Sequence, residues 1–94
     1  MNPTEIQFSK NLEALAVPQC RRIIQTLIKG SLSLEELPKA CKLSPASVDK
    51  HLEILKSAGL VKVRKVNGVS TVSLQKAKLE PTLKWFSQLT MNGE

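Results

Sequence analysis

The sequence predicts a mainly α-helical fold with one small β-hairpin, and two observations carry this prediction. Apolar residues recur at helical spacing over most of the chain, whereas valine-rich runs flank Asn67-Gly68. Asn-Gly between β-branched residues is the strongest short-range signal for a two-residue hairpin turn. At 94 residues, we expect a single domain over the whole sequence.

The first two helices are predicted from apolar spacing and from proline and glycine punctuation. Residues 4–16 form the first helix, with Phe8 and Leu12 among its apolar side chains. Pro18 opens the second helix, at a position where its missing N–H costs nothing. Gly30 is expected to stop this helix, because glycine readily adopts the backbone conformation that ends helices.

A third helix is predicted after a short extended link. Ser33 and Glu36 have the spacing of a capping box, in which each side chain bonds the backbone N–H of the other residue. Pro38 lies about one turn inside the expected helix, where it removes a hydrogen bond. It is therefore expected either to kink this helix or to shorten it.

The fourth helix, residues 45–58, has a clear start signal. Ser44 is a good N-cap, and Pro45 suits the first helical position. Apolar residues at i, i+4 and i+7 face the core: Val48, Leu52 and Leu55. The outer face keeps small or polar residues: Ala46, Ser47, Asp49, Lys50 and Glu53.

A hairpin and a closing helix complete the predicted order. Gly59 ends the fourth helix, and residues 60–74 form two strands joined by a type I′ turn at Asn67-Gly68. Residues 80–91 form the last helix, with Pro81 near its start. The order is helix, helix, extended link, helix, helix, strand, strand, helix.

Positive charge is concentrated over the third and fourth helices and the hairpin. Between Leu37 and Lys78, nine basic and two acidic residues give a net charge of +7, whereas the whole chain has a formal charge of +6. A basic block on this order of elements indicates a nucleic-acid partner. The alternative is an ordinary solvated face of lysines.

Local motifs occur in register with these elements. They are Leu15-Ala16-x-Pro18, Leu32-Ser33-x-x-Glu36-Leu37, Leu43-Ser44-x-x-Ser47-Val48-x-Lys50-His51-Leu52 and Leu55-x-x-Ala58-Gly59-Leu60-Val61. With them, the chain resembles the ArsR (arsenic-repressor, metalloregulator) family of winged helix-turn-helix transcription factors over about residues 10–90. The resemblance implies a homodimer that binds a double-stranded DNA operator and releases it on a signal.

The second helix of a helix-turn-helix lies in the major groove, and its first residues meet base edges. Helix 45–58 is therefore expected to read bases, with Ser47, Asp49 and Lys50 as candidates. Cations of the 60–74 hairpin, the wing, are expected to neutralise nearby phosphates. The predicted DNA-binding residues are Ser44, Pro45, Ala46, Ser47, Asp49, Lys50, His51, Lys62, Arg64 and Lys65.

Two of these residues have a second interpretation. Related proteins usually carry a small polar group at the position of Asp49, and a carboxylate there repels phosphates unless it reads a base or pairs with a neighbour. His51, the only histidine, matches a position that the family often fills with histidine. The resemblance implies that His51 contacts the DNA backbone or braces the helix.

The resemblance also indicates where the family's metal ligands would lie. Its best-known sensors carry thiolates at positions that match Ser33 and Glu35, and neither residue is a cysteine. Other members use Asp, His and Glu of the closing helix, where this chain offers Glu80, with Glu94 at the end. We therefore expect no metal and no cofactor.

Cys20 and Cys41 have two interpretations. Each is a small buried apolar side chain, or the two form a thiol switch. In a switch, Cys20 near the start of the second helix would have a lowered pKa and a reactive thiolate. Two cysteines are too few for a disulfide framework.

The terminal helices are expected to form a twofold dimer, because so small a chain has more apolar helical surface than one core needs. The alternative is that these residues close the core of a monomer. A twofold protein predicts an inverted-repeat operator. The candidate interface residues are Phe8, Leu12, Leu83, Trp85, Phe86 and Leu89.

The prediction is a homodimeric, sequence-specific DNA-binding regulator that acts as a repressor. The alternatives are a winged-helix module that docks an acidic protein and a redox-responsive regulator. No enzyme is expected, since one histidine and scattered serines give no nucleophile–base set. No apolar run approaches the roughly 18 residues of a membrane span, and the N-terminus has no apolar signal core, so we expect a cytoplasmic protein.

Overall fold

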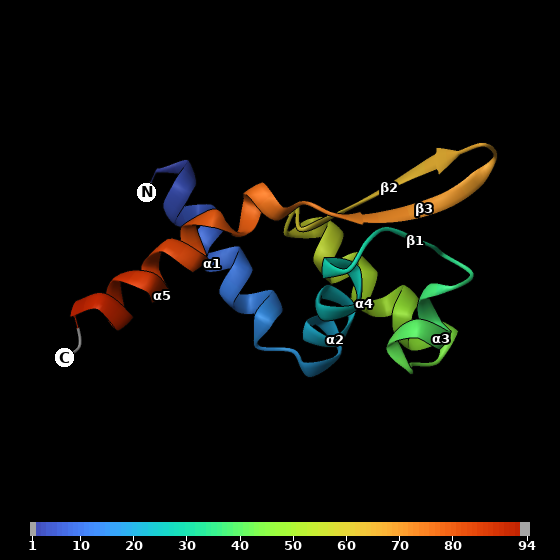
Figure 1. The fold of residues 1–94 in the computed structure, drawn as a ribbon, viewed down its shortest axis with the longest axis horizontal. Helices are drawn as coiled ribbons and strands as arrows, with labels where there is room; N and C mark the ends of the chain where they lie inside the picture. Colours follow the sequence, from blue (N-terminus) through green and yellow to red (C-terminus); the bar gives the residue numbers. More distant parts are fainter. Residues whose placement is uncertain (1, 93–94) are drawn as a thin grey trace.

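The computed structural model describes residues 2–92, and it confirms the mainly helical fold with a small antiparallel sheet. In chain order the elements are α1 (Pro3–Leu15), α2 (Pro18–Ile28), β1 (Leu32–Ser33), α3 (Leu37–Cys41), α4 (Pro45–Ser57), β2 (Val61–Val66), β3 (Val69–Leu74), the 3-10 helix η1 (Lys76–Leu79) and α5 (Glu80–Asn92). The molecule is elongated, with extents of 46 × 25 × 21 Å. The hairpin projects from one end of the body and α5 extends from the other (Figure 1).

The helix starts follow the local signals in the sequence. Asn2 Oδ1 accepts a hydrogen bond from Glu5 N at 2.8 Å, so α1 begins at Pro3, one residue earlier than expected. Pro18 opens α2 as predicted. Ser44 caps α4, because its Oγ accepts from Ser47 N at 3.1 Å.

The third helix is shorter than predicted. The capping box forms, since Glu36 N donates to Ser33 Oγ at 3.0 Å and Ser33 N donates to Glu36 Oε1 at 3.3 Å. However, it closes a turn rather than opening a helix, and α3 begins only at Leu37. Pro38 therefore lies in the first turn of a short helix, where no N–H is needed, and it does not kink a longer one.

The sheet explains why α3 starts late. Its strand order is β1-β3-β2, with Leu32 opposite Val72 and Ser33 opposite Thr71. Leu34 N then donates to Ser70 O at 2.9 Å, which holds the chain extended just before α3. Strands β2 and β3 form the wing.

The predicted type I′ turn is present at the tip of the wing. Asn67 and Gly68 both have positive φ, at 52° and 79°, as this turn requires. The last cross-strand pair before the turn is Val66 with Val69.

The core is aliphatic and lies between α2, α3, α4 and the base of the sheet. Its fully buried members include Cys20, Ile23, Leu37, Val48, Leu55, Leu60 and Val72. None of the three aromatic residues of the chain belongs to it, because Phe8 lies on α1 and Trp85 and Phe86 lie on α5. The core therefore fixes α4. Among the described residues, α1 contributes Ala14, with Leu15 packed against the core, and α5 contributes none.

Polar contacts attach α1 to this body. Asn11 is 0% exposed, and its Nδ2 donates to Lys78 O at 2.7 Å and to Thr82 Oγ1 at 3.0 Å. Gln7 Nε2 donates to Asn11 Oδ1 at 2.8 Å and to Ala58 O at 2.7 Å. One buried network thus links α1 to η1, to α5 and to the end of α4.

Candidate nucleic-acid interface

Helix α4 presents its N-terminal half to solvent. Val48, Leu52 and Leu55 are buried as predicted and hold one side of the helix in the core. On the opposite side, Asp49 and Lys50 are exposed. The outer face is therefore positioned by the core but free to contact a partner.

The start of α4 offers hydrogen-bond donors. Pro45 has no N–H, and Ser47 N is used by the Ser44 cap. This leaves Ala46 N as a first-turn donor for which the helix has no acceptor. The Ser44 hydroxyl accepts in the cap and can still donate its own hydrogen outward.

Two of the four charged side chains of α4 form an ion pair with each other. Over residues 2–92, the geometry gives one ion pair, Lys56 Nζ to Glu53 Oε2 at 3.6 Å, on the exposed surface. Asp49 therefore has no intramolecular ion-pair partner within this range. Pairing with a neighbour, one of the two conditions that make a carboxylate acceptable in a DNA groove, is not met inside this part of the chain.

His51 lies at the edge of the core. It is only 8% exposed, and its Nδ1 lies 2.7 Å from Ser47 O and 3.2 Å from Ser47 Oγ. A carbonyl oxygen only accepts, so Nδ1 carries the proton. This geometry supports the interpretation that His51 braces the first turns of α4.

The cations of the wing lie on both of its faces. Lys62, Arg64 and Lys65 are all exposed. Side chains alternate along a strand, so Lys62 and Arg64 share one face and Lys65 lies on the other. Their cross-strand neighbours are Ser73, Thr71 and Ser70, which are small and polar.

The lowered Cys20 pKa that the thiol-switch alternative requires is not found. Both cysteines are free and buried, and burial raises the pKa of each thiol. At Cys41, backbone hydrogen bonds and the charge of Arg22 oppose this effect without cancelling it. The structure therefore favours the buried apolar role for both side chains over a reactive thiolate.

The residues at the family's metal-ligand positions either bond another side chain or have no second metal ligand beside them. Ser33 is engaged with Glu36, and Glu80 is exposed on α5. Within the described range, no three His, Cys, Asp or Glu side chains gather as a metal-binding group. Glu94 lies outside the described residues. No helix in the part of the chain that the structure describes is long and apolar enough to span a bilayer.

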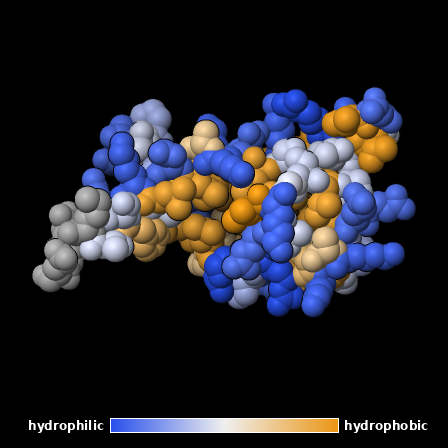
Figure 2. Space-filling model, viewed as in Figure 1, coloured by the Kyte–Doolittle hydropathy of each residue, from blue (hydrophilic) through white to orange (hydrophobic). Residues whose placement is uncertain are grey.

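Exposed apolar side chains gather on the terminal helices. Leu83 is 61% exposed, and the other predicted interface residues on α5 are about half exposed: Trp85, Phe86 and Leu89. Phe8 lies 5.5 Å from Trp85 between ring centroids, so these two candidates also pack on each other. Figure 2 shows an apolar area over the terminal helices and a smaller one at the outer end of the hairpin.

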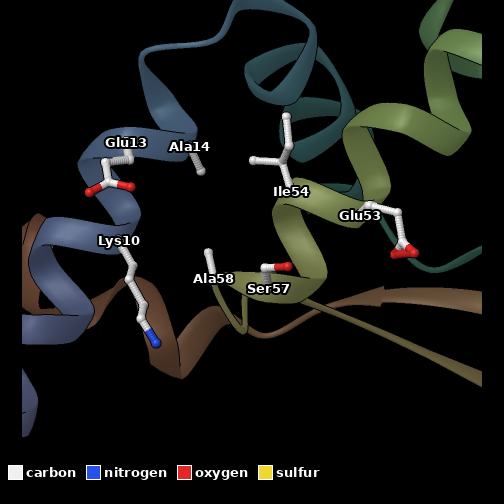
Figure 3. A pocket seen from close by; sticks show the side chains of 7 residues that line it. All are labelled: Lys10, Glu13, Ala14, Glu53, Ile54, Ser57 and Ala58. Carbon is white, nitrogen blue, oxygen red and sulfur yellow. The ribbon is translucent and has the colours of Figure 1, made fainter.

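A groove between α1 and the C-terminal half of α4 lies outside this interface. Its volume is about 500 Å³, and its lining is Lys10, Glu13, Ala14, Glu53, Ile54, Ser57 and Ala58. Figure 3 shows Ala14, Ile54 and Ala58 around the open space, whereas the carboxylates of Glu13 and Glu53 point away from it. The groove is at the opposite end of α4 from Ser44.

Two features of the structure were not predicted from the sequence. Gln7 and Asn11 form an inward-facing polar pair with i, i+4 spacing. The sequence shows this spacing, but two polar residues so spaced are also typical of a helix face in contact with solvent. Val66 and Val69, exposed at the wing tip, were predicted from the sequence only as strand residues. Their distance from the core became apparent only in three dimensions.

Comparisons with known proteins agree with this geometry. A model of the helix-turn-helix domain family matches residues 9–64. A comparison with curated protein sequences gives no match. The structure is similar to that of an ArsR family transcriptional regulator, with 25% identity, 90% of this chain and 88% of that chain covered, and a TM-score of 0.73.

Two further solved structures are similar. A possible transcriptional regulator for arsenical resistance has 29% identity, covers 83% of this chain and 81% of its own, and gives a TM-score of 0.69. The homodimeric winged helix-turn-helix DNA-binding domain of a possible ArsR-family regulator from Mycobacterium bovis has 20% identity, covers 94% and 84%, and gives a TM-score of 0.70.

Proposed function

We propose that the chain acts as a homodimeric repressor of an inverted-repeat operator. It belongs to the helix-turn-helix domain family, and it is a DNA-binding transcriptional regulator of the ArsR, winged-helix type. The observation that carries this proposal is the capped and exposed N-terminal half of α4 beside a wing that has no acidic residue from Leu60 to Leu74.

Helix α4 enters the major groove in this proposal. Ser47, Asp49 and Lys50 meet base edges, and the unpaired carboxylate of Asp49 accepts a hydrogen bond from cytosine N4. The hydroxyl of Ser44 and the N–H of Ala46 hold a phosphate at the start of the helix. His51 braces the turn that presents Ser47.

The wing contributes affinity more than sequence choice. Lys62, Arg64 and Lys65 neutralise backbone phosphates beside the groove, and each contact releases condensed counterions. Binding therefore weakens as salt increases.

Dimerisation uses the exposed apolar faces of α1 and α5. Leu12, Leu83, Phe86 and Leu89 are too exposed for a monomer core and gather on the same two helices. The Mycobacterium bovis domain, which has a similar fold, is homodimeric, and this supports a dimer for the present chain. The twofold axis then sets two α4 helices about 34–36 Å apart, one helical turn of DNA.

The signal is not one of the family's usual metals. Ser33 and Glu35 stand where thiolates would be required, and Ser33 is already bonded to Glu36. Stoichiometric binding of Zn²⁺ that changes operator affinity would contradict this part of the proposal.

The variants Lys50→Ala and Arg64→Ala test the interface. Each should weaken DNA binding, and Arg64→Ala should reduce the slope of log affinity against log salt by about one phosphate contact. Lys10→Ala removes an exposed cation from α1 and is the matched control, which should leave both quantities unchanged. If all three variants behave like the parent protein, the module docks something other than DNA through this face.

A further inference from the structure

A cleft between α2 and the C-terminal end of α3 has a lining of one charge sign. Its volume is about 350 Å³, which lies within the range of small-molecule pockets. Three of its lining residues are cations, Arg22, Lys29 and Lys42, and none is acidic. A cleft lined by one sign of charge concentrates ions of the opposite sign. The lining therefore favours an anionic ligand.

Helix α2 supplies most of the polar groups of this cleft. Arg22, Gln25 and Lys29 have i, i+3 and i+7 spacing, so they share one face of the helix. The opposite face is held in the core by Ile23 and Leu27, which are buried. Within the described residues, the side chains of Gln25 and Lys29 have no hydrogen bond or ion pair. The core thus fixes a row of donors that no group of the chain uses.

The third cation comes from the turn after α3. Lys42 has a left-handed backbone conformation, with φ of 56°, at the C-cap of this helix. Glycine most often fills such a position, because a β-carbon is strained there. The chain accepts this strain and keeps a cation beside the cleft, and strained residues are frequent at functional sites.

Arg22 joins the two sides of the cleft. Its Nη1 donates to Lys42 O at 3.4 Å, which leaves its other N–H donors available. A guanidinium group has donors in a planar fork that matches the oxygen atoms of a phosphate group. Arg22 is therefore the best candidate to bind a phosphate directly, with Lys29 and Lys42 adding charge from either side.

We propose that this cleft binds a small phosphate-bearing molecule and that this ligand is the signal that releases DNA. The second part rests on the proposed function. Only Leu43 separates Lys42 from Ser44, which in that function holds a DNA phosphate at the start of α4. A bound anion neutralises the cations of the cleft and repels that phosphate. Ligand and DNA therefore weaken each other's binding, as linkage between two sites requires.

The first measurement is an NMR titration of the ¹⁵N-labelled full chain with pyrophosphate, without DNA and at constant ionic strength. Pyrophosphate has two phosphate groups, which suits cations contributed by two elements. Saturable shifts should be confined to the amides of residues 22–29 and 40–43. The expected Kd is about 1 mM, the affinity that two charge-assisted hydrogen bonds provide.

The variants Arg22→Gln and Arg21→Gln form a matched pair. Both arginines are exposed on α2, and each donates through Nη1 to one backbone carbonyl, Lys42 O for Arg22 and Leu15 O for Arg21. Only Arg22 lines the cleft. Arg22→Gln should weaken pyrophosphate binding about tenfold, whereas Arg21→Gln should leave it unchanged.

The second measurement is the fluorescence anisotropy of duplex DNA from the region upstream of the protein's own gene. At about three times the parent's Kd, pyrophosphate should weaken DNA binding by the parent protein about threefold. Arg22→Gln should lose less than about 1.5-fold under the same conditions, because its cleft is mostly empty.

Each outcome supports or overturns one claim. Shifts that do not saturate, or an equal loss in both variants, would overturn the ligand site. Saturable binding without an effect on DNA affinity would overturn its role as the signal. If Arg22→Gln alone weakens DNA binding and the salt slope in the absence of pyrophosphate, the cleft holds a DNA phosphate and the inference fails. A parent protein that binds no duplex contradicts the proposed function, and the NMR titration still decides whether the cleft binds phosphate.

Discussion

At the scale of single residues, Asn11 shows how one polar side chain helps to fix a helix that contributes only Ala14 to the buried apolar core. It is completely buried and bonds Lys78, Thr82 and Gln7 through both ends of its amide. Leu12, the next residue, points outward and remains 39% exposed. The docking of α1 therefore combines satisfied hydrogen bonds with the apolar burial of Ala14.

Replacing Asn11 with alanine should strongly destabilise the protein. The change leaves Lys78 O and Thr82 without a buried partner, which costs about 1–3 kcal/mol. Urea unfolding followed by circular dichroism measures this loss. Ser9→Ala, on the exposed face of the same helix, should change the free energy of unfolding by less than about 0.5 kcal/mol. Equal effects of both changes would show that the network is not important.

The buried thiols predict a dependence on pH. Burial raises the pKa of Cys20 above the ordinary value of 9.0, so the folded state holds the thiol proton more tightly than the unfolded state. This contribution to stability is complete below pH 9.0 and is lost as the pH rises through the folded pKa. Unfolding in urea as a function of pH should show the decline, and Cys20→Ala should reduce it.

The burial of Cys20 and Cys41 also predicts that both thiols react slowly with alkylating reagents. Near neutral pH, iodoacetamide should label Cys20 and Cys41 far more slowly in the native protein than in urea, as measured by mass spectrometry. Labelling of native Cys20 at the unfolded rate would restore the redox-responsive alternative.

At the scale of elements, local signals in the sequence predicted most helix starts and the hairpin turn, whereas pairing between distant residues determined where α3 begins. The cap at Ser44 and the hairpin turn at Asn67-Gly68 depend on neighbours within four residues, so the sequence reveals them. The late start of α3 depends on Leu34 bonding Ser70, a partner far along the chain. No local pattern predicts that contact, which is why the sequence placed the helix start too early.

The cap of α4 allows a prediction at this scale. Ser44→Ala removes the acceptor for Ser47 N and should lower the free energy of unfolding by about 1 kcal/mol. Ser44→Gly also removes the acceptor but should cost only a few tenths of a kcal/mol, because glycine leaves the freed amide open to water. Thermal unfolding of both variants measures the two losses, and a Ser44→Ala protein as stable as the parent would show that the cap bond does not stabilise the helix.

At the scale of the whole molecule, the sequence predicted the order of elements and the location of positive charge. It also predicted that the terminal helices carry more apolar surface than one core needs, and Leu12 and Leu83 are indeed exposed. It did not predict the exposed valines at the wing tip, because spacing assigned Val66 to a strand without revealing its exposure. Burial depends on where every other element packs, so this apolar tip became visible only in the folded chain.

The terminal helices give a prediction about assembly. The double variant Leu83→Glu/Phe86→Glu should be monomeric in sedimentation experiments and remain folded, because both side chains are exposed in the isolated chain. Ile28→Glu introduces one negative charge at an exposed apolar residue on α2 and should remain dimeric. A dimer that survives the double variant would place the interface elsewhere.

The most direct test of the central claim is a fluorescence-anisotropy titration at two salt concentrations. It compares duplex DNA from the region upstream of the protein's own gene with a scrambled duplex of the same composition. The account predicts tighter binding to the upstream duplex, weaker binding at higher salt, and two protomers per duplex. Equal weak binding to both duplexes would leave only non-specific electrostatic attraction, and no binding to either would contradict the account and favour a protein-docking module.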